Sequence, residues 1–260
     1  MIKTQIGEWS AAQAALTQAL TLNPDDPIGN YFYASNLINV GRTNEALDYA
    51  MRGANSGPQF WPKTLQVIMT LADLDRVDDA QAMLATALKT WPDNDELKEF
   101  AMILAVRYAD PTKAAATLDD PALAAGQTQA RLHLLRLEAD TRAHPSPATV
   151  EAAAGVIKAL YAGPDGAFGA AINFMVIGRV DDAYASIGEM RTPLRNAPYV
   201  GNPSTFFRPY AAKFRADPRF MPLAAKLGLV TIWKATKWPD FCTASDAPYD
   251  CRAVAEKLAR

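Results

Sequence analysis

Apolar and polar positions along the chain follow helical spacing, and the alternation typical of strands is nearly absent. Alanine recurs throughout, which favours helices that pack closely through small side chains. The pattern therefore predicts an all-α fold. Beyond residue 94, helices are expected over 95–108, 122–143, 148–162 and 165–177, in a pair ending near Met190, and, after a loop over 192–205, over 206–215 and 218–227.

An internal period of 34 residues is the strongest feature of the first part of the chain. This is the length of a tetratricopeptide unit, in which two antiparallel helices bury their apolar faces against neighbouring units. Small residues recur where helices cross, and a proline recurs after the second helix. The repeating columns are Ala12, Ala46 and Ala80; Leu16, Ala50 and Leu84; Ala19, Gly53 and Ala87; and Pro24, Pro58 and Pro92.

The period predicts a tetratricopeptide-type helical hairpin array, an α-α superhelix, with an irregular helical C-terminal part. Tetratricopeptide repeats cover residues 1–108, degenerate helical repeats 109–190, and a helical pair with a tail 191–260. The first unit is incomplete, because 7–24 matches only a second helix. We therefore expect either a fragment of a longer protein, or a face covered by residues 1–6 together with a second copy in a homodimer.

Turns between paired helices share one chemistry. Thr43 or Asn44 is expected to cap the helix after Gly41. The acid pairs Asp78/Asp79 and Asp181/Asp182 follow similar turns, where carboxylates favour a helix start over acid–base catalysis.

The first helix of each unit lines a concave groove in arrays of this kind, so its outward positions predict where a protein or peptide partner binds. Tyrosine, methionine and arginine, which are enriched at binding surfaces, occur among them. The alternative is that some of these side chains pack against the irregular middle helices. The expected exposed groove residues are Tyr31, Ser35, Asn39, Leu65, Met69, Asp73, Glu99 and Arg107.

Charge is unevenly distributed along the chain. Residues 1–190 carry 14 basic and 23 acidic side chains, whereas 191–237 carries nine basic side chains and one acidic one. The basic stretch indicates an anionic partner, a contact with the acidic part of the chain, or a solvated surface. The overall balance of −2 does not favour nucleic-acid binding by this region. No apolar run reaches the roughly 18 residues of a membrane-spanning helix, so no membrane insertion is expected.

No pattern of catalytic residues is present in the sequence. His133 and His144 lack the spacing of a zinc site, and there is no phosphate-binding glycine loop or nucleophile elbow. We therefore predict no enzyme activity, metal or cofactor, and a function in binding.

A second signature lies in the C-terminal region. Asp217 is expected to cap a helix with Pro218 at its first position, and Gly228 to end it in a left-handed turn with Leu229 packing back. The signature reads Phe214-Arg215-Ala216-Asp217-Pro218-Arg219-Phe220, Leu223, Lys226-Leu227-Gly228-Leu229, Trp233 and Trp238-Pro239-Asp240-Phe241-Cys242.

Together with the repeats, this region resembles the C-terminal tetratricopeptide region of bacterial signalling proteins. In that group the array follows a winged-helix DNA-binding domain, as in CadC-like transcriptional regulators, or a class III adenylate cyclase domain. The resemblance covers about 7–108 and 206–251. It implies the sensor part of a winged-helix regulator; the alternatives are a regulatory domain of a nucleotide cyclase and a freestanding scaffold of an envelope complex.

Cys242 and Cys251 are the two cysteines of the chain. Their even number favours a disulfide, which implies an oxidising compartment. For the CadC-like arrangement this means the periplasm, as part of a membrane-anchored protein. The alternative is a reduced pair in the cytoplasm.

Overall fold

The computed structural model describes residues 8–56, 59–190 and 202–258, and within these ranges the chain is helical and contains no strand. This confirms the all-α class. The chain divides into two compact units, each described by itself below. The discontinuous unit combines Met1–Leu74 with Thr192–Arg260, and the central unit is Asp75–Arg191. The expected division into three consecutive segments follows chain order and differs from this grouping.

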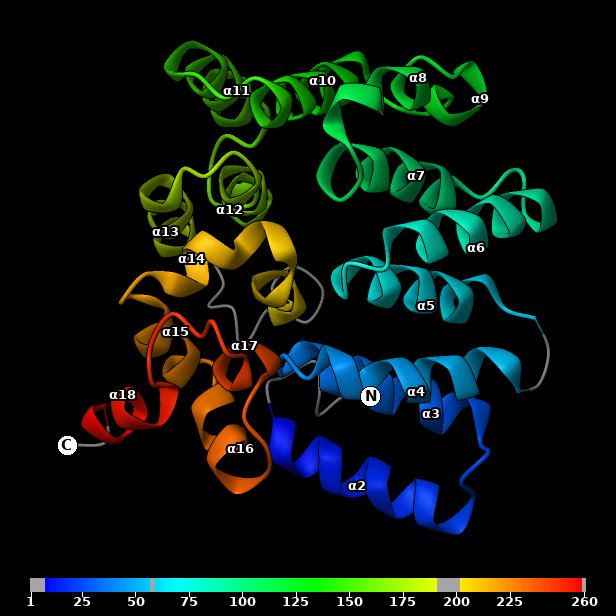
Figure 1. The fold of residues 1–260 in the computed structure, drawn as a ribbon, viewed down its shortest axis with the longest axis vertical. Coiled ribbons are helices and arrows are strands. Elements are labelled where there is room, and N and C mark those ends of the chain that lie inside the picture. The colour runs from blue at the N-terminus through cyan, green and yellow to red at the C-terminus, as the bar shows by residue number, and fades with distance from the viewer. Residues whose placement is uncertain (1–7, 57–58, 191–201, 259–260) are drawn as a thin grey trace. The chain divides into compact units, whose positions relative to one another are not determined.

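The helices of the discontinuous unit lie in two stretches of sequence (Figure 1). The N-terminal stretch forms α2 (Trp9–Leu22), α3 (Pro27–Asn39), α4 (Thr43–Asn55) and α5 (Trp61–Asp73). The C-terminal stretch forms η3 (Pro203–Phe207), η4 (Pro209–Ala211), α14 (Ala212–Ala216), α15 (Phe220–Lys226), α16 (Leu229–Ala235), α17 (Asp240–Thr243) and α18 (Cys251–Lys257).

The central unit consists of helices joined by short turns. Within it α6 packs on α7, α7 on α10, α10 on α11, and α12 on α13. Its elements are α6 (Val77–Thr90), α7 (Asp95–Arg107), η1 (Pro111–Lys113), α8 (Ala114–Leu118), α9 (Pro121–Ala124), α10 (Gln129–Ala143), α11 (Pro147–Leu160), α12 (Ala167–Val176) and α13 (Val180–Glu189).

The small residues of the 34-residue columns lie at helix contacts. Ala46 and Ala80 are fully buried. A Cβ added to Gly53 would lie 3.0 Å from the Tyr31 backbone nitrogen, so glycine lets α4 approach α3 closely. Pro24 and Pro92 follow the ends of α2 and α6, as expected, whereas Pro58 lies outside the described residues.

Two expected helices are shorter or more broken than the pattern predicted. The helix expected over 122–143 is split into α9 and α10, because Gly126 adopts a φ of +85° and the Thr128 side chain caps α10. The helix expected over 206–215 is replaced by η3, η4 and α14, because Pro209 lacks the N–H that a continuous helix needs. Of the expected loop 192–205, residues 192–201 lie outside the described residues, and η3 begins at Pro203.

The C-terminal signature differs in detail from the expectation. The Asp217 side chain accepts a hydrogen bond from the Arg219 N–H at 2.9 Å, but α15 begins only at Phe220. Asp217 therefore stabilises the turn before the helix and does not cap it. Gly228 does adopt the left-handed conformation, with φ +76°, and Leu229 is buried.

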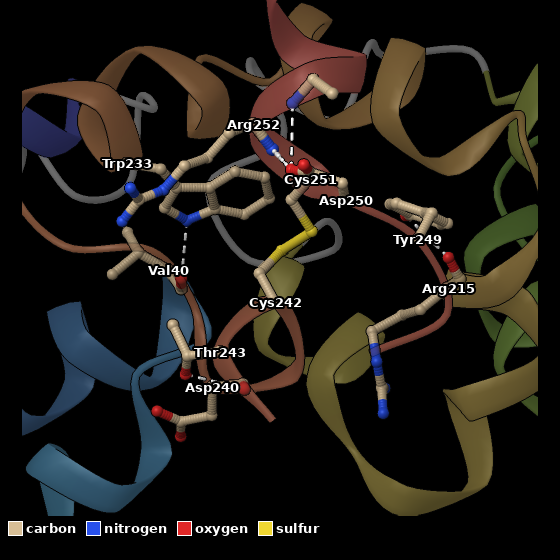
Figure 2. Close-up of a disulfide and its surroundings, with 11 residues drawn as sticks. Val40, Arg215, Trp233, Asp240, Cys242, Thr243, Tyr249, Asp250, Cys251 and Arg252 are labelled. Atoms are coloured by element: carbon tan, nitrogen blue, oxygen red, sulfur yellow. Dashed lines mark hydrogen bonds between the residues drawn. A yellow bond between two sulfur atoms is a disulfide. The ribbon is translucent and has the colours of Figure 1, made fainter. Parts of the chain in front are cut away.

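The cap of α4 comes from the far end of the chain, not from Thr43 or Asn44. The Asp240 Oδ2 atom accepts a hydrogen bond from the Asn44 N–H at 2.9 Å, and the Asp240 N–H donates to the Gly41 carbonyl at 2.8 Å. Trp233 donates its indole N–H to the Val40 carbonyl at 2.8 Å, as Figure 2 shows. The tail is thus held against the turn between α3 and α4.

The C-terminal stretch also covers part of α2. Trp9 is buried and donates its indole N–H to the Leu227 carbonyl at 2.8 Å, and α16 packs against α2 (Figure 1). The sequence analysis expected this face to be covered either by a preceding part of a longer protein or by residues 1–6 together with a second copy. In the structure, the turn between α15 and α16 of the same chain contacts α2 at Trp9.

Candidate binding groove

Six of the eight expected groove residues line one cavity of about 310 Å³ in the discontinuous unit. Because α3 and α5 both expose one side at this cavity, residues three or four positions apart on each helix lie next to one another. The six are Tyr31, Ser35 and Asn39 from α3, and Leu65, Met69 and Asp73 from α5. The structure therefore brings together the residues that the repeat register selected in this unit, although Asn39, which was expected to be exposed, is buried.

The wall of the groove is largely apolar and aromatic. Trp61 and Pro62, at the start of α5, and Ile38, on α3, add to the apolar side chains already named. Burial raises the pKa of Tyr31 above its ordinary value, because the charged phenolate would lose solvation there. Such a surface suits apolar side chains of a partner.

Polar groups between α3 and α5 fix the two helices and leave two buried acceptors without a donor in the described residues. Gln66 donates from Nε2 to the Ser35 hydroxyl at 2.6 Å and to the Tyr31 carbonyl at 3.3 Å. The Oε1 atom of Gln66 and the Oδ1 atom of Asn39 are buried and find no donor in the described part of the chain. Both residues line the cavity.

One end of the groove is formed by residues that the repeat pattern could not predict. Asn202, Ser204 and Arg208 belong to the C-terminal stretch and line the same cavity. The Arg208 Nε atom lies 4.0 Å from the Asp73 carboxylate, whose side chain is only 6% exposed. No local sequence signal marks these residues, because their contacts cross more than 100 positions of the chain.

Glu99 and Arg107 lie in the central unit, and Arg107 corrects the prediction. Its side chain is buried and not exposed: Nε and Nη2 pair with the Glu138 carboxylate at 3.0 and 3.1 Å, and Nη2 also donates to Asn173 at 2.8 Å. These contacts join α7, α10 and α12. Glu99 lies 3.4 Å from Arg131. The prediction that Arg107 is exposed was therefore wrong.

Cys242 and Cys251 form a disulfide, with Cα atoms 5.8 Å apart (Figure 2). It joins α17 to the first residue of α18. Nearby, the Tyr249 hydroxyl donates to the Arg215 carbonyl at 2.8 Å, and Asp250 caps α18. The disulfide therefore closes a loop next to the segment that caps α4.

The acid pairs and the two histidines lie at helix starts, at a helix end or on the surface. Asp78/Asp79 and Asp181/Asp182 lie in the first turns of α6 and α13. His133 is exposed, and His144 is the C-cap of α10.

A search for a metal cluster or a membrane span found neither among the residues described. No group of three or more His, Cys, Asp or Glu side chains there could hold a metal ion. No helix in 8–56, 59–190 or 202–258 combines the length and apolar character that crossing a bilayer requires.

Comparisons of the chain with protein-family models, with curated proteins and with solved structures found no match.

Proposed function

We propose that the chain is a protein-interaction domain of the tetratricopeptide type that binds an extended peptide segment of a partner in the groove between α3 and α5. The observation that carries this is the convergence of the six groove residues on one cavity. They were selected from the sequence by repeat register alone, and the cavity around them combines the apolar side chains of Ile38, Trp61 and Pro62 with polar groups. The proposal is one of recognition and involves no reaction.

The 34-residue period supports a tetratricopeptide-type array. The equivalent positions Ala46 and Ala80 are both buried, and α3 and α4 form a closely packed antiparallel pair (Figure 1). Arg42, Arg76 and Arg179 each stand at an N-cap and pair with a carboxylate three residues later. One local design is thus used at three hairpin turns.

The sensor role in a bacterial signalling protein is the wider context that we propose. The two parts of the chain that carry the resemblance, the repeats and the tail, are joined at Trp233–Val40 and Asp240–Asn44. This supports a single module. The disulfide supports an oxidising compartment, for which we propose the periplasm.

Selection from a random peptide library tests the groove. Peptides selected on the wild-type protein are titrated against Tyr31→Ala and Met69→Ala variants, and we expect binding to weaken about tenfold or more at such a contact. Met51→Ala is the matched control, because Met51 is exposed on α4 and lies outside the groove. Equal affinity for the wild type and both groove variants would place binding elsewhere and refute the proposal.

A further inference from the structure

A second cavity in the discontinuous unit, of about 590 Å³, lies beside the segment that the disulfide closes. Its wall is formed by the start of α4, the end of α5, the η4–α14 segment, and residues 240–248 around α17. Phe207 and Phe241 provide aromatic surface there. This volume falls within the range of about 300–1,000 Å³ that is usual for small-molecule sites.

Charged side chains around this cavity are separated by sign. Both basic side chains, Lys213 and Arg215, come from α14. The acidic ones come from other elements: Asp73 ends α5, Asp240 begins α17, and Asp246 lies in the loop after α17. A dipolar ligand would find its basic partners on α14 and its acidic partners on the other elements of the wall.

Four of these side chains form no close ion pair in the described part of the unit, although Asp73 acts electrostatically on Arg215 and Arg42 on Asp240. Asp73 is paired with Arg208, but Lys213, Arg215, Asp240 and Asp246 take part in no ion pair within the described residues. Lys213 and Asp246 are exposed and solvated, whereas Arg215 and Asp240 are partly buried. A charge that is partly removed from water gains more from a complementary group than a solvated one does.

The two partly buried charges are held in place by backbone groups. The Arg215 Nη1 atom donates to the carbonyls of Phe206 and Arg208 at 2.6 and 2.8 Å. The Asp240 carboxylate is fixed by the Asn44 N–H. Burial lowers the pKa of Arg215 to about 10 and raises the pKa of Asp240, so both charged forms lack full solvation. Groups that are fixed before a ligand arrives bind it with a smaller entropy loss.

We infer that this cavity binds a small zwitterion of the amino-acid type. The ligand carboxylate faces Lys213 and Arg215 on α14, and its ammonium group faces Asp240 and Asp246. An apolar ligand side chain packs against Phe207 and Phe241. This site is separate from the peptide groove, although Asp73 lines both cavities.

Isothermal titration calorimetry on the full chain tests the ligand class. The probes are free L-phenylalanine, L-leucine and the dipeptide of these two, together with phenethylamine and 3-phenylpropanoate, which each lack one of the two charges. We expect at least one zwitterion to bind. Each single-charge analogue should bind with an affinity at least about tenfold lower, because it loses one charge-assisted contact. The absence of heat for every zwitterion up to millimolar concentration overturns the inference. An amine or carboxylate that binds as tightly as the zwitterion also overturns it.

Variants locate the site. Lys213→Ala and Asp246→Asn change exposed side chains, so circular dichroism should show an intact fold, and each is expected to weaken zwitterion binding about two- to fivefold. Lys226→Ala is the matched control, because Lys226 is exposed on α15 and does not line the cavity. Unchanged affinity in both cavity variants refutes the site. Peptide binding by the Tyr31→Ala and Met69→Ala variants is measured in parallel. A negative result for the peptide groove can then be distinguished from a negative result for the zwitterion site.

Discussion

Replacing Trp233 with phenylalanine would test the contact that joins the tail to the first helical pair. The Trp233 side chain is 1% exposed, and its indole N–H donates to the carbonyl of Val40, which is also buried. Phenylalanine keeps an aromatic ring at this position but has no N–H. The Val40 carbonyl would then remain buried without its donor.

The expected loss combines two effects. A buried acceptor that loses its only strong donor costs about 1–3 kcal/mol. The phenylalanine side chain also has three fewer heavy atoms, so a small cavity remains in the packed aromatic cluster and lowers the free energy of unfolding by about 1 kcal/mol. Together we expect the free energy of unfolding of the discontinuous unit to fall by about 3 kcal/mol.

Amide hydrogen exchange measures this loss in the correct unit, because bulk unfolding curves combine the signals of both units. In the Trp233→Phe variant, exchange in peptides spanning 36–46 should become roughly 100-fold faster. Trp238→Phe is the matched control, because Trp238 is half-buried in the same tail and makes no indole hydrogen bond within the described residues. Equal acceleration in the two variants would show that the indole–carbonyl bond adds no stability.

Three further changes have clear expected outcomes. Replacing Cys242 and Cys251 by serine removes a link across nine positions, and the chain-entropy estimate predicts a loss of about 2.5 kcal/mol; equal urea midpoints with and without reductant would contradict it. Arg107→Met leaves the fully buried Glu138 without its bidentate partner and should lower the free energy of unfolding by about 3–5 kcal/mol. The double variant Arg107→Met/Glu138→Met should lose less, because no unpaired charge stays buried. Thermal unfolding that ranks the two variants in the opposite order would refute this. Burial raises the pKa of Asp240 above 3.8, so the folded state binds this proton more tightly than the unfolded state and stability is lost as pH rises from 3.8 through the raised pKa. Relative to Asp240→Asn, the wild type should therefore lose unfolding free energy in urea titrations across that interval, and a difference that is constant with pH would contradict the assigned burial.

Local pattern was sufficient for much of the fold. The helical class and the starts of α6 and α13 follow from helical spacing and from acidic residues in the first turn of each helix. The register of α3 and α5 was also predicted well enough to select six side chains that share a cavity. These features depend on contacts within one helical pair, which is why sequence alone reaches them.

Contacts between distant parts of the chain were beyond such reasoning. The cap of α4 is supplied by Asp240, 196 residues after Asn44, and Arg208 completes the groove from a similar distance. Arg107 was assigned to an exposed groove position by repeat register, yet it is buried, and Glu138 and Asn173 compensate that burial. Periodicity carries no information about which remote carboxylate or amide meets a given helix.

The long separation between Val40 and Trp233 has a consequence during protein synthesis. A ribosome adds about 5–20 residues per second, so the 193 positions between them take roughly 10–40 s to translate. Throughout that interval the turn between α3 and α4 has neither the Trp233 donor nor the Asp240 cap, and the end of α2 that carries Trp9 lacks its cover. The nascent N-terminal helices are therefore exposed to proteases and chaperones until the tail emerges and docks.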